Sequence, residues 1–159
     1  MSHYLIEQFR FVRRCTLDYV SRIDGHRMEA VPTGLKNNIK WNLGHIYMSS
    51  EKIIFQLAGE QASIPEKFVS YFGMGTSPAS WSDEPPTKEE LIDLLEQQLI
   101  KVEKRMEPRI GESLQEVYRT SAGLRISSVA ECISFCLYHE GMHFAAIKSI
   151  HQQVQSEQA

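Results

Sequence analysis

Apolar residues recur every three or four positions in four long stretches of this sequence, and this spacing constrains the fold more than any other feature. The stretches cover residues 2–24, 37–58, 87–108 and 128–152. A repeat of that length is typical of an amphipathic α-helix that buries one face. No stretch alternates for long at the period of a strand, although residues 114–126 could hold a short extended piece. The sequence therefore predicts an all-α fold, a four-helix bundle.

Residues with strong local preferences indicate where these helices begin and end. Thr87 with Glu90, and Ser128 with Glu131, have the spacing of a capping box, in which two side chains satisfy the free amides of a first helical turn. Gly59 follows the second apolar stretch, where a helix commonly ends. These signals agree with the boundaries that the apolar spacing predicts.

Length and composition predict a single domain over residues 1–159. Hydrophobic residues make up 42% of the chain and charged residues 23%, which is enough apolar material for a buried core. The net charge is −3, with both signs interspersed, so we expect no nucleic-acid partner. No apolar run approaches the length of a membrane span. Three cysteines without an export signal favour reduced thiols and a cytoplasmic location.

A long connection joins the second and third predicted helices. Residues 59–86 carry Phe68, Tyr71, Phe72 and Trp81 among Gly, Ser and Pro. A connection of that length is uncommon in a compact domain unless it covers something. We expect it to cross the bundle as a partial lid, with a dimer contact as the alternative. Trp81 could roof a pocket there, or serve only to anchor the connection by packing.

The clearest functional signal is a pair of histidines on the last helix. His139 and His143 are four residues apart, so both imidazoles lie on one helix face and can reach one ion. That face also carries Cys136 and Ile147, so it points into the bundle. Two buried imidazoles are costly without partners. A shared metal ion would satisfy both, and the alternative is a pair of hydrogen-bonded core histidines.

The residues from His139 to His143 also match the H-E-x-x-H pattern of zinc proteases. The extended form of that pattern needs a glycine and a third histidine downstream, where this chain has Ala146 and Ser149. His151 is rotated by about 80° from His143 on an ideal helix, which makes it a poor third ligand. We therefore do not expect a protease.

A third ligand can come from His45 on the second predicted helix. Asn42, His45 and Ser49 form a polar seam beside the apolar stripe of that helix, and this seam could line a pocket between helices. Together with the pair on the last helix, His45 would complete an open site of three histidines. Asn42, one turn earlier, could hydrogen-bond a bound water or substrate, or simply cap a neighbouring group.

The segment Trp41-Asn42-Leu43-Gly44-His45-Ile46 and the segment from His139 to His143 resemble the DinB-like superfamily over nearly the whole chain. This resemblance implies an up-down-down-up four-helix bundle with a long crossover between helices 2 and 3, often forming a homodimer. It implies His45, His139 and His143 as ligands of nickel, zinc or iron. Family activities include thiol S-transferases that use low-molecular-weight thiols and thiol-dependent isomerases, and many members have no known substrate.

A divalent ion on three neutral imidazoles lowers the pKa of a bound thiol or water. A thiolate would give S-transfer to a small electrophile, and a hydroxide would give hydrolysis; a metal-stabilised stress-response binding module is the non-enzymatic alternative. Glu140 could be a general base or orient a ligand, or it could pair with a basic residue at a helix seam. Cys136 could supply a thiolate, but a buried apolar role is the commoner one.

Overall fold

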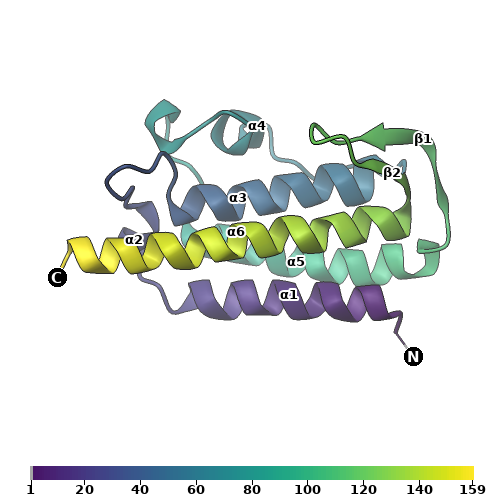
Figure 1. The fold of residues 1–159 in the computed structure, drawn as a ribbon, viewed down its shortest axis with the longest axis horizontal. Coiled ribbons are helices and arrows are strands. Elements are labelled where there is room, and N and C mark those ends of the chain that lie inside the picture. The colour runs from purple at the N-terminus through teal and green to yellow at the C-terminus, as the bar shows by residue number, and fades with distance from the viewer. Residues whose placement is uncertain (1) are drawn as a thin grey trace.

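The computed structural model describes residues 2–159, most of which are helical, and this part of the fold prediction is confirmed. Four long helices lie side by side, as Figure 1 shows. They are α1 (Tyr4–Ser21), α3 (Ile39–Ser50) with its π-helical continuation η1 (Glu51–Gln56), α5 (Lys88–Met106) and α6 (Val129–Glu157). α6 contacts both α1 and α3, and α5 contacts the same two helices.

Side-chain caps account for the starts of these helices. The Thr87 hydroxyl accepts from the Glu90 amide, and the Glu90 carboxylate accepts from the Thr87 amide, so the predicted capping box is present at α5. Ser128 caps α6 by accepting from the Glu131 amide. Each cap satisfies amides that a first helical turn leaves free. α3 begins in the same way, because the Asn38 side chain accepts from the Trp41 amide at 2.8 Å.

Shorter helices fill the connections. They are α2 (Gly25–Glu29), α4 (Phe68–Phe72), η2 (Pro78–Ser80) and η3 (Glu107–Arg109). α1 ends before the expected position because Asp24 caps α2, accepting from the Arg27 amide at 2.9 Å. α6, in contrast, continues past the predicted residue 152 to Glu157.

The prediction of an all-α chain is wrong in one respect, because a small antiparallel sheet precedes α6. It consists of β1 (Ser113–Arg119) and β2 (Arg125–Ser128), with Arg119 opposite Arg125. Six of the seven residues of β1 are exposed. A strand without a buried face needs no alternation of apolar and polar residues, which is why the sequence signal was weak.

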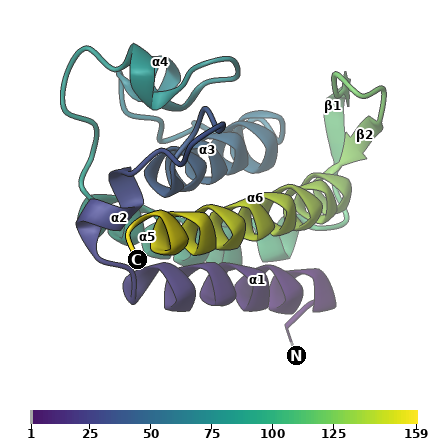
Figure 2. The ribbon, with the colours of Figure 1, turned by 60° about the vertical axis from the view of Figure 1, so that its left-hand side comes forward.

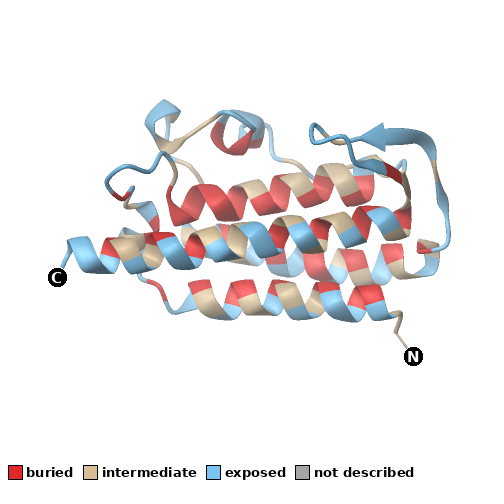
Figure 3. Cartoon of the chain, in the orientation of Figure 1, coloured by how far each residue is buried: buried red, intermediate tan, exposed pale blue. Residues whose placement is uncertain are grey.

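The core lies between the inward faces of the long helices, as the buried residues in Figure 3 show. Two clusters of buried apolar side chains follow one another along the bundle. Phe68, Tyr71 and Phe72, from the connection between α3 and α5, belong to the first cluster, so these aromatics pack into the core, where α4 contacts α3. Figure 2 shows α4 above α3, with the β1–β2 hairpin farther along the same side. Both long connections therefore lie on the same side of the bundle, that of α3.

Among residues 2–159, no helix combines the length and the apolar character that a membrane span requires.

Candidate metal centre

Three histidines from two helices meet at one point between α3 and α6. One ring nitrogen from each of His45, His139 and His143 lies within 4.8 Å of the others. The ring centroids of His45 and His143 are 4.8 Å apart, and those of His139 and His143 are 4.5 Å apart. His139 and His143 are partly buried, and His45 is the most buried of the three. The structure thus brings together the three residues that the sequence singled out.

The crossover fixes the orientation of His45. Its Nδ1 lies 2.7 Å from the main-chain oxygen of Phe72 in α4. A carbonyl oxygen can only accept, so Nδ1 carries the proton and Nε2 keeps its lone pair. Trp41 stacks on the same imidazole, with centroids 4.7 Å apart and an angle of 11° between the planes. The ring of His45 is therefore held by a hydrogen bond at its edge and by an indole on its face.

Gly44 permits this approach of the crossover to α3. A β-carbon at residue 44 would lie 2.4 Å from the ring of Phe72, well inside van der Waals contact. A larger side chain would push α4 away from the helix, and the Phe72 carbonyl would move with it. The close packing of Phe72 therefore explains why residue 44, next to His45, is a glycine.

Asn42 orients His143 in the same way. The Oδ1 atom of Asn42 lies 2.8 Å from Nδ1 of His143. The Nδ2 group of Asn42 donates to the Asn38 carbonyl at 2.8 Å, which sets the amide so that its oxygen faces the imidazole. Nδ1 of His143 is therefore the protonated nitrogen, and Nε2 is free. Histidines that ligate metals usually donate their second N–H in this manner.

Burial keeps the three imidazoles neutral. It lowers the pKa of His45, although the hydrogen bond to Phe72 opposes the shift. Burial lowers the pKa of His139 to about 4, with a further contribution from His45. The pKa of His143 falls to about 3, again through burial first and then through the two neighbouring histidines. At neutral pH each ring therefore presents a lone pair rather than a charge, as a metal ligand must.

Glu140 turns away from the histidines and pairs with Arg13 on α1. The Arg13 Nη2 and Glu140 Oε2 atoms are 2.9 Å apart, and Nε of Arg13 is 2.9 Å from Oε1. The two side chains are 0% and 1% exposed, so no water competes for this pair. A pair with a basic residue at a helix seam was the alternative to a catalytic role for Glu140, and the structure contains such a pair, so we assign no reacting atom to Glu140.

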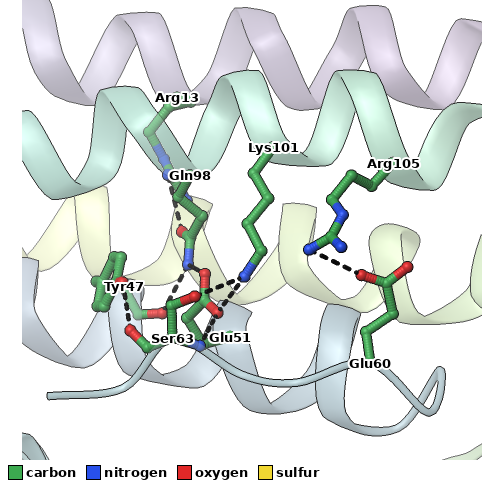
Figure 4. Close-up of polar contacts among 8 residues, drawn as sticks. All are labelled: Arg13, Tyr47, Glu51, Glu60, Ser63, Gln98, Lys101 and Arg105. Atoms are coloured by element: carbon green, nitrogen blue, oxygen red, sulfur yellow. Dashed lines mark hydrogen bonds and ion pairs between the residues drawn. The ribbon is translucent and has the colours of Figure 1, made fainter.

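The ion pair belongs to a polar network that crosses the core, part of which is drawn in Figure 4. Arg13 donates to Oε1 of Gln98 on α5, and Nε2 of Gln98 donates to Glu51 of η1 and to the main-chain oxygen of Tyr47. Glu51 also accepts from Lys101, at 2.9 Å. The turn of α6 that carries His139 is therefore linked through α1 and α5 to the end of α3.

Cys136 and Trp81 lie outside the histidine group. Cys136 is 1% exposed within the second core cluster, and burial raises the pKa of its thiol, so it remains protonated. The indole of Trp81 donates to the main-chain oxygen of Tyr71 at 2.9 Å and packs against the first cluster. Trp81 anchors the crossover, and the tryptophan that contacts the site is Trp41. Its position four residues before His45, on the same helix face, is the signal that could have identified it.

Comparisons with known proteins place these observations in a wider context. Residues 8–147 match the model of the DinB superfamily. No curated protein matches the sequence. The crystal structure of a conserved protein from Enterococcus faecalis aligns with 98% of this chain and 99% of its own, with a TM-score of 0.71 and 13% sequence identity. A likeness at that identity shows that the two chains share a fold.

Proposed function

Because this chain belongs to the DinB superfamily, we propose that it holds a divalent metal ion with His45, His139 and His143 and acts as a metal-dependent thiol S-transferase on small electrophiles. The observation that carries the proposal is the convergence of three neutral imidazoles, two of which have Nδ1 engaged and Nε2 free. Such a donor set suits zinc, nickel or iron.

The residues around the site fit an ion better than they fit three unliganded rings. The Phe72 carbonyl accepts from Nδ1 of His45, and Oδ1 of Asn42 accepts from Nδ1 of His143. Nε2 of each of these two rings is left without a strong hydrogen-bond partner. The hydroxyl of Ser49 is 3.4 Å from Nε2 of His45, too long for a good hydrogen bond. The lone pairs of His45 and His143 face the same point and repel one another, and a cation there would reverse that interaction.

A bound divalent ion supplies Lewis acidity that lowers the pKa of a thiol or a water molecule. In the overall reaction the thiol sulfur bonds to the electrophilic carbon, the leaving group departs with the bonding electrons, and the thiol proton passes to solvent. The chain itself orients the rings through Asn42, Trp41 and the crossover, and it keeps them unprotonated by burial. The thiol would be a low-molecular-weight cosubstrate.

We also propose that the four long helices form an up-down-down-up bundle in which residues 59–86 are the crossover. The run of colour along α1, α3, α5 and α6 in Figure 1 supports this topology, as do the contacts of α6 with α1 and α3. In that arrangement α3 and α6 are antiparallel neighbours, and their facing turns supply the histidines.

Metal binding is tested by elemental analysis of untagged protein, followed by titration with zinc, nickel and iron(II). We expect about one ion per chain, and we expect His143→Ala to abolish binding. The matched control is His151→Ala, since His151 lies two turns away with Nδ1 beside the Tyr19 hydroxyl, and we expect it to leave binding nearly intact. Equal loss in both variants, or no uptake by the natural protein, would refute the assignment.

The reaction type is tested with the metal-loaded protein and a panel of electrophiles, with and without thiol. Turnover that requires thiol supports S-transfer. Turnover that proceeds in water alone would instead indicate hydrolysis, and no turnover under either condition would leave metal binding as the whole function.

A further inference from the structure

We infer that a pocket between the β1–β2 hairpin and α6 binds an uncharged aromatic group of the substrate next to the metal centre. The inference rests on the proposed function, because it takes the electrophile's reactive end to lie at the three histidines. The pocket has a volume of about 400 Å³, which is at the small end for ligand sites and suits one aromatic ring with short substituents.

Phe135 connects this pocket to the histidines. Its side chain lines the pocket, and its ring centroid is 6.1 Å from that of His139. Phe135 precedes His139 by one helical turn, so the pocket and the metal centre occupy successive turns of α6. Phe135 borders both the pocket and the histidine group, so we place the ring of the substrate about one helical turn from its reactive end.

The lining of the pocket selects for an apolar and aromatic group. Leu124 and Ile126 of the hairpin line it together with Phe135 and Tyr138 of α6. The rings of Phe135 and Tyr138 are 6.3 Å apart and inclined by 47°, so a third ring could pack against both at common aromatic distances. The wall is therefore better suited to a ring than to a flexible polar chain.

Its charged residues favour an uncharged group. Arg125 and Glu131 both line the pocket and carry opposite charges. The Glu131 carboxylate accepts from the amide and the hydroxyl of Ser127, and Nη1 of Arg125 donates to the same hydroxyl at 3.1 Å. The two charges offset one another and already have partners, so neither an anion nor a cation gains a dedicated partner here.

The test compares two hydroxamates as zinc-binding probes on the zinc-loaded protein. Acetohydroxamate occupies the metal alone, whereas 3-phenylpropanohydroxamate adds a ring on a short linker. We expect the phenyl probe to bind about tenfold more tightly, as burial of one ring predicts. Affinities are measured by calorimetry, which requires no turnover.

Two variants locate the added affinity. Ala122→Trp places bulk at the pocket wall, and Leu124→Asp places a charge there; both residues line the pocket. In each, the tenfold preference should fall to near one while acetohydroxamate binds as before. Ala79→Trp is the matched control, because Ala79 is also an exposed alanine in a connection and lies outside the pocket.

The outcomes separate the two proposals. A phenyl probe that binds no better than acetohydroxamate, or a preference that survives in both variants, overturns the pocket assignment and leaves the metal centre standing. If acetohydroxamate itself fails to bind because the protein takes up no zinc, the proposed function fails and this inference fails with it.

Discussion

At the scale of single residues, the hydrogen bonds of the histidines determine which nitrogen is available. The free imidazole has two nitrogens, and its tautomer follows from the partner that accepts the proton. Asn42 performs this task for His143, with its own amide held by the Asn38 carbonyl at the start of α3. Asn42, whose amide is held at the start of α3, thus orients the imidazole of His143 on α6.

Replacing Asn42 by alanine should therefore weaken metal binding without removing a ligand. We expect an affinity loss of about 10- to 100-fold, as is usual when the partner of a ligating histidine is removed. Competition with a chelator of known affinity measures the loss. Ser49→Ala is the control, since Ser49 lies one turn from His45 on the same helix but makes only a long contact to it. Unchanged affinity in Asn42→Ala would contradict the orienting role.

The sequence predicted that the three histidines converge, but it did not predict their hydrogen-bond partners. The spacing of His139 and His143 and the polar seam around His45 are local properties of two helices, readable from helical geometry. The partner of His45 is a main-chain oxygen 27 residues away, and every residue has such an oxygen. Glu140 likewise pairs across 127 residues with Arg13. Contacts of that separation depend on the packing of the finished fold.

At the scale of elements, α3 and α6 must keep one relative rotation for the rings to converge. Apolar packing alone tolerates small rotations, because many arrangements of similar volume fill a core. The buried network through Arg13, Gln98 and Glu51 is directional and links α6 to the end of α3 by way of α1 and α5. We therefore expect it to hold the histidine-bearing turns in register.

The double variant Arg13→Met/Glu140→Met tests that role. Replacing a buried ion pair by apolar residues of similar size is often neutral or stabilising, by about 1–4 kcal/mol, so the variant should fold. Its zinc affinity should nevertheless fall, and the visible spectrum of the cobalt(II)-substituted protein should broaden. Glu140→Ala alone, which leaves Arg13 buried and unpaired, should cost about 3–5 kcal/mol in urea unfolding. Natural affinity and an unchanged spectrum in the double variant would assign the network to stability alone.

The helices were predictable, whereas only a weak signal for a short extended piece over residues 114–126 marked the hairpin, for a physical reason. The caps at Thr87 and Ser128 are interactions within four residues, and the apolar stripes reflect burial of one face. In the two strands only Ile126 is buried, and Leu114, Ser127 and Ser128 are half-buried, so the sequence lacks a repeating pattern. The residues of η1 lie within the second predicted helix, and the sequence prediction did not distinguish its π-helical turn.

At the scale of the whole molecule, the buried histidines make folding depend on pH. The unfolded chain binds protons on His139 and His143 near pH 6.5, whereas the folded chain resists them until the pH nears 4 and 3. Between those limits the unfolded state binds more protons, so acid favours unfolding. Above pH 6.5 neither state binds protons at these two histidines, so their contribution to the pH dependence of stability disappears.

The metal-free protein should therefore lose stability as the pH falls from about 6.5 toward 4. Urea midpoints measured across this range at constant ionic strength would show the decline. His139→Gln/His143→Gln removes both titrating rings, so its midpoint should fall less steeply over the same range. Parallel curves for the two proteins would assign the acid sensitivity to other groups.

The carbonyl of Phe72 has a consequence for protein engineering. Because this oxygen belongs to a connection, a minimal bundle that joins α3 to α5 by a short linker would lose the group that sets the tautomer of His45. Both coordinating helices would survive in such a truncated scaffold, yet one imidazole could present either nitrogen. Grafting this centre onto another bundle thus requires transplanting α4 together with the helices.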